Sequence, residues 1–203
     1  MTESSLPELS PDALGSALRE AVEFVDAEGW GQPPTLFALV PTALVAQTQP
    51  DLADTLDTSE LTLIAQEALP VGEDNSIAEL EHLLGTTSWP PGVAGAALVQ
   101  EIIVLPPDAE DDLDDAFEPL LADPDAADAA AVSAARAHPD SKVARLAAGA
   151  LRDGQALTLM QLQPEPGEDP YQPIELLSHP DLAPNLVHAL AATLDEDLDP
   201  DEY

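Results

Sequence analysis

The feature that most constrains the fold is an Asp-Gly pair that separates two apolar runs. Asp153 and Gly154 follow residues 143–152 and precede residues 155–163. Glycine supplies the positive φ that a two-residue type I′ turn requires, so the two runs are predicted to form a β-hairpin. A hairpin commits the chain to antiparallel pairing, and it needs further strands or helices to become stable.

Three other segments are predicted to be strands because they are short, apolar and bounded by proline or polar residues. They cover residues 35–40 (TLFALV), 61–67 (LTLIAQE) and 93–105. Gly95 lies inside the last of them, where a glycine marks a bulge or a close approach of another backbone. With the hairpin, these segments make about five strands.

The clearest helix is predicted over residues 11–28. Its apolar residues recur every three or four positions, which places them on one stripe of a helix. Ser10 is suited to cap its start and Pro11 to occupy its first position, and Gly29 is suited to end it.

Other helices are predicted at residues 42–47, 76–84, 126–137 and 182–194. Ser76 and Glu79 form a capping box, and Asp181 is the expected cap of the last helix. Strands and helices do not alternate strictly, which favours an α+β fold. We expect a largely antiparallel sheet of about five strands with helices packed mainly on one face.

The chain is intensely acidic, with 40 Asp and Glu against 5 Lys and Arg and a formal net charge of -35. Apolar residues still make up 45% of the chain, enough for a real core. We expect a single acidic domain over residues 1–203, with an acidic loop at 106–125 and a disordered acidic tail at 196–203.

This charge argues against direct nucleic-acid binding, because neutralising phosphates needs a basic surface. It favours a basic or neutral protein partner, although adaptation to a salty cytoplasm would produce the same composition. The N-terminus lacks the charged and apolar regions of a signal peptide, and no run of about 20 apolar residues exists. The expected location is therefore the cytoplasm, with no membrane contact.

No pattern of residues points to catalysis, a cofactor or a metal. The chain has no cysteine. A calcium loop starting at Asp108 would have Leu113 where glycine is needed and Pro119 where glutamate is needed. No serine-nucleophile, phosphate-loop or dinucleotide motif occurs. The four histidines form no zinc-binding pair: His82, His138, His179 and His188.

Two Trp–Pro stretches are the candidate contact residues. Trp30 precedes Pro33 and Pro34, and Trp89 precedes Pro90, each just before a predicted strand. Surfaces of tryptophan and proline can bind peptides or proteins. The alternative is that both indoles close the ends of the sheet.

Four of the five basic residues lie between residues 136 and 152. Arg145 and Arg152 are the candidates for a small anion-accepting spot, although a separation of seven puts them on opposite faces of a strand. The alternative is that these residues neutralise neighbouring acids.

Four segments of the chain are distinctive in this order: GWGQPPTLFALVPT (29–42), SWPPGVAGAALVQEIIVLPP (88–107), ARLAAGALRDG (144–154) and DLAPNLVHALAATL (181–194). Together they resemble an uncharacterised actinobacterial family of small acidic cytoplasmic proteins. The resemblance implies a cytoplasmic α+β protein and carries no catalytic residues.

The sequence therefore favours a non-enzymatic protein-interaction module. An enzyme or small-ligand protein with an unrecognised pocket is the main alternative. Mimicry of DNA by ordered carboxylates is a third, and it needs acids in a regular row, whereas the predicted strands carry few.

Overall fold

The computed structural model describes residues 6–52, 58–66, 69, 77–104, 133–134, 137–165, 167, 173–178 and 182–194. The predicted acidic loop at 106–125, the tail at 196–203 and most of the Ala-rich helix at 126–137 lie outside these residues. The proposed capping residues Ser76 and Asp181 lie outside them as well.

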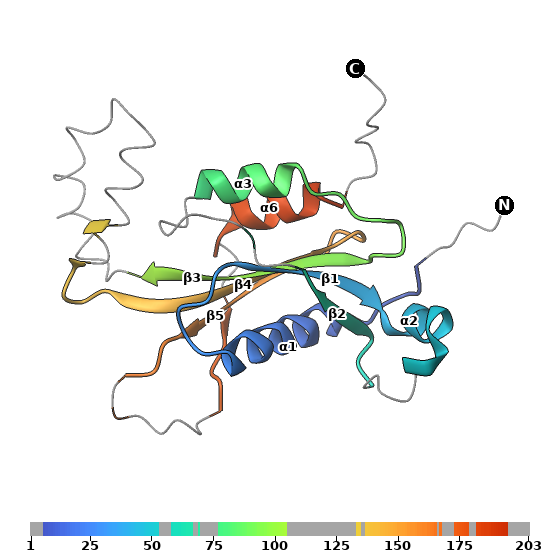
Figure 1. Cartoon of the computed structure of the whole chain (residues 1–203), viewed down its shortest axis with the longest axis horizontal. Coiled ribbons are helices and arrows are strands. Elements are labelled where there is room, and N and C mark those ends of the chain that lie inside the picture. The colour runs from blue at the N-terminus through green and yellow to red at the C-terminus, as the bar shows by residue number, and fades with distance from the viewer. Residues whose placement is uncertain are drawn as a thin grey trace, which may run out of the picture.

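A six-stranded antiparallel sheet, in the order β2-β1-β3-β4-β5-β6, forms the centre of the molecule (Figure 1). The strands are β1 (Thr35–Pro41), β2 (Leu61–Ala65), β3 (Gly95–Val104), β4 (Lys142–Leu151), β5 (Ala156–Leu162) and β6 (Leu177–Ser178). The strands expected from the sequence and the hairpin are all present. Strand β6 was not expected, because two residues carry no periodic pattern.

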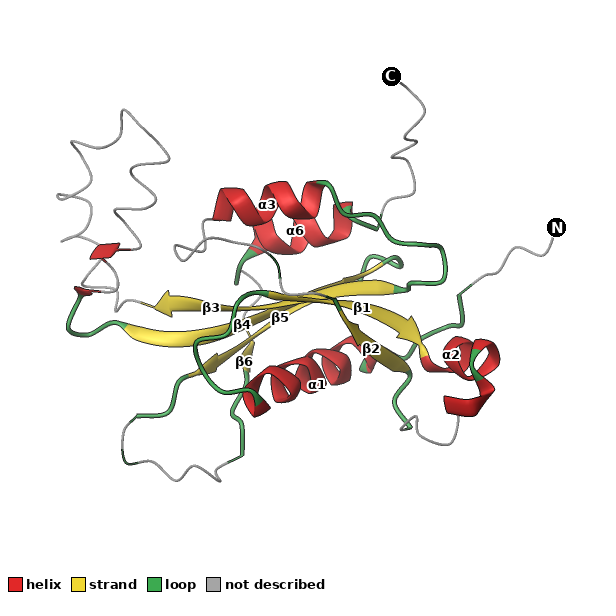
Figure 2. Cartoon of the chain, in the orientation of Figure 1, coloured by secondary structure: helices red, strands yellow, loops and turns green. Residues whose placement is uncertain are grey.

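Helices lie on both faces of this sheet (Figure 2). Helix α1 (Ala13–Ala27) covers one face, and α6 (Pro184–Ala192) packs on the other with α3 (Ile77–Gly85) against it. Helix α2 (Thr42–Thr48) and a 3₁₀ turn (Pro50–Leu52) follow β1. None of the helices in the described part of the chain combines the length and the hydropathy that a membrane span requires.

The α+β class and the antiparallel sheet are thus confirmed, whereas the helices divide between the two faces. The reason lies in β3 and β4, which are apolar at consecutive positions and therefore bury side chains on both faces. Odd-numbered residues such as Ala97 and Ala147 pack under α1. Even-numbered residues such as Leu98 and Ala148 pack under α6.

Close approach of backbones explains Gly95. A Cβ atom at this position would lie 2.5 Å from the carbonyl oxygen of Ala150 and 2.4 Å from a methyl of Leu151. Gly95 pairs directly with Leu151 across β3 and β4. The predicted close approach is confirmed.

The turn between β4 and β5 is of a different type from the one predicted. The backbone N–H of Gly154 donates to the carbonyl of Leu151 at 3.1 Å, and Leu151 N–H donates to Gln155 at 2.8 Å. These two bonds close a three-residue loop, 152–154, in which only Gly154 has a positive φ, of 91°. A type I′ turn needs a positive φ at both of its central residues, so that prediction is wrong. The Asp153 carboxylate accepts the Gln155 N–H at 2.9 Å, which stabilises this longer loop.

Two predicted helix caps are also corrected. Helix α1 begins at Ala13 rather than at Pro11, with Asp12 at the N-cap. The Ser10 hydroxyl, which was expected to cap the helix, donates to the carboxylate of Glu60. Ala183, in a left-handed conformation with φ 51°, is the N-cap of α6, and Pro184 follows at the first helical position. Gly29 follows the end of α1 with φ 89°, as predicted.

Candidate functional site

The first tryptophan lies against a buried arginine at one end of the sheet. Trp30 follows α1, and its ring centroid lies 4.1 Å from the guanidinium carbon of Arg145. Trp30 is half-buried, Pro33 is exposed and Pro34 is buried. A guanidinium stacked on an indole is a favourable cation–π pair, more so when it is removed from water.

Arg145 is fully buried on the α1 face of β4, where its two terminal nitrogens donate hydrogen bonds to groups of the protein itself. One terminal nitrogen, Nη1, donates to Asp26 Oδ1 at 2.8 Å and to Gln161 Oε1 at 2.7 Å. The other, Nη2, donates to the carbonyl of Gly29 at 2.9 Å and lies 3.8 Å from Glu101 Oε1. Arg145 therefore neutralises two acids, Asp26 and Glu101. This agrees with the alternative given above, that the basic residues neutralise neighbouring acids rather than bind an outside anion.

Glu101 extends this network to the loop before β1. Its carboxylate accepts the Gly31 N–H at 2.8 Å and the Gln32 N–H at 3.2 Å. The loop that carries Trp30 is thus bound to β3 through Glu101 and to β4 through Arg145. We call Asp26, Glu101, Arg145 and Gln161 the buried ion network. Its guanidinium group has no surface to offer to an outside anion.

The second tryptophan is bound at the opposite end of the sheet by the other candidate arginine. Arg152 donates to the carbonyls of Val93 at 2.8 Å, of Trp89 at 3.1 Å and of Leu194. The Trp89 indole N–H donates to Thr193 Oγ1 at 3.0 Å. Arg152 therefore connects the loop before β3 to the end of α6, and its partners are carbonyls rather than an ion.

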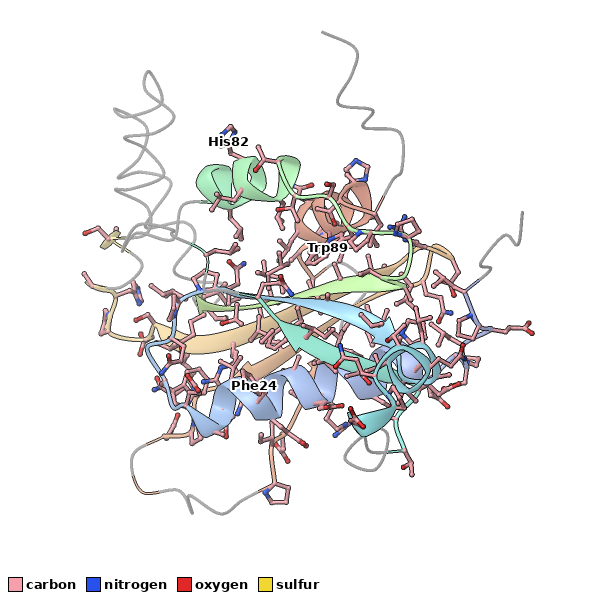
Figure 3. All side chains as sticks on the ribbon, turned by 45° about the vertical axis from the view of Figure 1, so that its right-hand side comes forward. Phe24, His82 and Trp89 are labelled. Carbon is pink, nitrogen blue, oxygen red and sulfur yellow. The ribbon has the colours of Figure 1, made fainter. Side chains whose placement is uncertain are left out.

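The Trp–Pro stretches do not form one contact patch. Trp30 stacks on Arg145 on the α1 face, whereas Trp89 packs against the core beneath α6, near the turn at Arg152. Figure 3 shows Trp89 on the same side of the sheet as His82, with Phe24 on the opposite side. Pro90 is exposed beside Trp89, but the half-buried indole is held inward by its hydrogen bond.

Sequence reasoning missed a different surface, at the edge strand β2. Phe24 on α1 is 51% exposed and Ile64 on β2 is 45% exposed. The Phe24 ring meets Phe37 of β1 edge-on, with centroids 5.7 Å apart. We call residues 61–65 together with Phe24 the β2 margin. The signal in the sequence was LTLIA, an uncharged run in a chain of net charge -35.

A shallow groove beside α1 is a candidate site for a small ligand. It encloses about 490 Å³ between the first half of α1 and strands β5 and β6. Its polar lining comprises Asp12, Ser16, Arg19, Gln155 and Ser178. The lining contains no histidine, and its one carboxylate is that of Asp12.

The histidines of the described part of the chain lie on different elements. His82 and His188 are exposed on α3 and α6, and His138 is half-buried before β4. His179 lies outside the described residues. In the described part of the chain, no three His, Asp or Glu side chains gather where they could hold a metal ion.

Comparison with known proteins gives a family match over most of the chain and a partial similarity to a longer protein. The family model described as "PPA1309-like protein" matches residues 14–195, almost the whole chain. A copalyl diphosphate synthase of Streptomyces cyslabdanicus is 34% identical over 79 residues, which cover 39% of this chain and 14% of that protein. No solved structure matches the chain.

Proposed function

The chain belongs to the PPA1309-like protein family, and we propose that it works as a protein-interaction module rather than as an enzyme. The β2 margin carries this proposal, because it exposes Phe24 and Ile64 on either side of an open sheet edge. A strongly charged chain gains nothing in solubility from such side chains, and grouped exposed apolar residues are typical of protein contacts.

Charge supports a basic or neutral protein as the partner. No Lys or Arg occurs between residues 20 and 135, the part of the chain that contributes β1, β2 and β3. An electronegative surface speeds association with a cationic partner and weakens it as salt rises. With this proposal go two expectations from the sequence, that the protein is cytoplasmic and that the chain is actinobacterial.

Two alternatives have less support. A small ligand would use the groove beside α1, whose polar groups include a single cation, Arg19. A DNA mimic would need a row of exposed carboxylates along the sheet, but Glu101 is turned inward onto Gly31 and Gln32. Neither alternative accounts for the exposed Phe24.

A pull-down with matched variants tests the proposal. The full chain, Ile64→Gln and Leu177→Gln are each immobilised and exposed to lysate at low salt and at 0.5 M salt. Ile64 and Leu177 are matched, because both are aliphatic strand residues, 45% and 50% exposed, at opposite edges of the sheet. We expect one stoichiometric partner that persists at 0.5 M salt, is lost with Ile64→Gln and is retained with Leu177→Gln.

The contrary result is a collection of basic proteins that salt releases equally from all three baits. That outcome would mean that charge alone attracts them, and the groove would become the better candidate.

A further inference from the structure

We propose that the β2 margin binds its partner by strand addition, taking up an extended segment that alternates cationic and apolar residues. This inference rests on the proposed function and specifies its partner and its mode of binding. It follows from three observations: which backbone groups β2 turns outward, where Phe24 lies, and how charge is distributed along the chain.

The hydrogen bonds at the two ends of β2 fix which residues bond to β1. Gln66 N–H donates to the carbonyl of Leu36 at 2.8 Å, and Thr42 N–H donates to the carbonyl of Glu60 at 2.9 Å. These even-numbered pairs continue the register of β1 with β2. In an antiparallel ladder, hydrogen-bonded and non-hydrogen-bonded pairs alternate. Residues 62 and 64 therefore bond to β1.

Leu61, Leu63 and Ala65 consequently point their N–H and carbonyl groups away from the sheet. These groups recur about every 6.8 Å, the two-residue repeat of an extended chain. In the described part of the chain, no strand pairs with this edge. The run LTLIA also has none of the charges or prolines that usually protect an edge strand. The other edge, β6, is only two residues long.

Phe24 lies on the same flank as this edge. Asp26 faces β4 and β5, because its carboxylate bonds to Arg145 and Gln161. Two residues correspond to about 200° around a helix, which turns Phe24 to the opposite flank, towards β1 and β2. Its contact with Phe37 of β1 agrees. An added strand would therefore have Phe24 beside one of its faces and Ile64 beside the other.

Charge decides between a second copy of this chain and a cationic segment. Pairing two copies through β2 would join two surfaces from molecules of net charge -35. Exposed acids also flank the margin, with Glu60 directly before β2 and Glu23 next to Phe24. Alternate residues of a strand point to the same face. A segment with Lys or Arg at alternate positions can therefore turn its cations to the face beside Phe24 and Glu23, and its apolar residues to the face beside Ile64.

A synthetic peptide provides the test. The probe is acetyl-(Lys-Val)4-amide, labelled with fluorescein, and the control is acetyl-(Lys-Pro)4-amide, which has the same charge but cannot form a ladder. Fluorescence anisotropy with the full chain at 0.15 M salt should give binding about tenfold or more tighter for the probe than for the control. Equal affinities would overturn strand addition and leave only charge attraction.

Hydrogen exchange measured by NMR identifies the edge. In the free protein, the amides of Thr62 and Ile64 should exchange slowly, and those of Leu61, Leu63 and Ala65 quickly. The probe should slow the three odd-numbered amides by about tenfold or more and change the even-numbered ones little. Protection at β6 instead would overturn the proposal. Protection of the odd-numbered amides without peptide, growing with protein concentration, would also overturn it in favour of a second copy.

A proline substitution separates docking from folding. Ala65→Pro removes an outward N–H without removing a bond to β1, whereas Ala65→Val keeps that donor. We expect Ala65→Pro to unfold at the same urea concentration as the wild type yet to bind the probe about tenfold more weakly, and Ala65→Val to bind normally. Normal binding by a folded Ala65→Pro would contradict strand addition.

These outcomes stay distinct from those of the pull-down. A partner that depends on Ile64 but leaves Leu61, Leu63 and Ala65 unprotected would retain the interaction module and reject strand addition. If no bait, including the unmodified chain, retains a stoichiometric partner at 0.5 M salt, the proposed interaction module is itself rejected.

Discussion

The most quantitative prediction concerns the buried ion network and the stability of the variant Arg145→Met. Methionine fills much of the same space, but it leaves the carboxylates of Asp26 and Glu101 without their counter-charge. Breaking a buried ion pair by removing one partner costs about 3–5 kcal/mol. The lower end applies, because Asp26 is 35% exposed and Glu101 keeps its backbone donors at Gly31 and Gln32. We therefore expect a loss of about 3 kcal/mol in the free energy of unfolding.

Urea denaturation followed by circular dichroism measures this loss. With a slope of about 2 kcal/mol per M, the unfolding midpoint should fall by about 1.5 M. Lys142→Met is the matched control, because Lys142 lies on the same strand and pairs with Glu165 in an exposed salt bridge at 3.0 Å. That substitution should cost about 0.5 kcal/mol or less, although its ion pair is nearly as short as the 2.8 Å pair of Arg145 with Asp26.

A result of about 1 kcal/mol or less for Arg145→Met would refute the reasoning, because the network would then be worth no more than a surface pair. The double variant Arg145→Met/Asp26→Asn adds a second check. Replacing the unpaired Asp26 carboxylate should recover part of the stability lost in Arg145→Met. If the losses of the two single variants simply add, the two residues do not interact.

Two other predictions concern the sheet and the net charge. Gly95→Ala should lower the free energy of unfolding by about 1–3 kcal/mol, because the new Cβ meets the Ala150 carbonyl, while Gly85→Ala, which has open space, should change it by about 0.5 kcal/mol or less. Thermal melts check both, and equal melting temperatures would contradict the close approach. Raising NaCl from 0.01 to 1 M shortens the screening length from about 30 Å to about 3 Å, so the melting temperature should rise as repulsion among 40 acids weakens; a fall would contradict this reasoning.

Much of the fold could be predicted from the sequence because the strands and α1 have strong local signals. The Asp-Gly turn and its flanking apolar runs indicated β4 and β5, and the stripe on residues 11–28 indicated α1. Such patterns record which side of an element is buried. They do not record what lies opposite it, so the division of helices between two faces was missed.

The roles of the arginines could not be predicted, because their partners are distant in sequence. Asp26 is 119 residues from Arg145, and Leu194 is 42 residues from Arg152. Parity along a strand separated the two arginines correctly, but it gave no indication that one would be buried under Trp30. The Trp–Pro stretches were singled out for their composition, whereas their contacts are mainly internal.

The β2 margin escaped sequence analysis for a related reason. Residues 61–67 were recognised as a strand, but a sequence does not say whether a strand lies at the centre or at the edge of a sheet. An apolar, uncharged strand is ordinary at the centre. It becomes informative only when the strand order places it at the edge, with Phe24 exposed beside it.

Site-specific photo-crosslinking tests the central claim most directly. Benzoylphenylalanine is introduced in place of Ile64 in one full-length variant and of Leu177 in another, and each is irradiated in lysate of the source organism. The account predicts a crosslink from position 64 to one partner protein, reduced by excess acetyl-(Lys-Val)4-amide, and none to that partner from position 177. Crosslinks to the same proteins from both positions, or from neither, would contradict it.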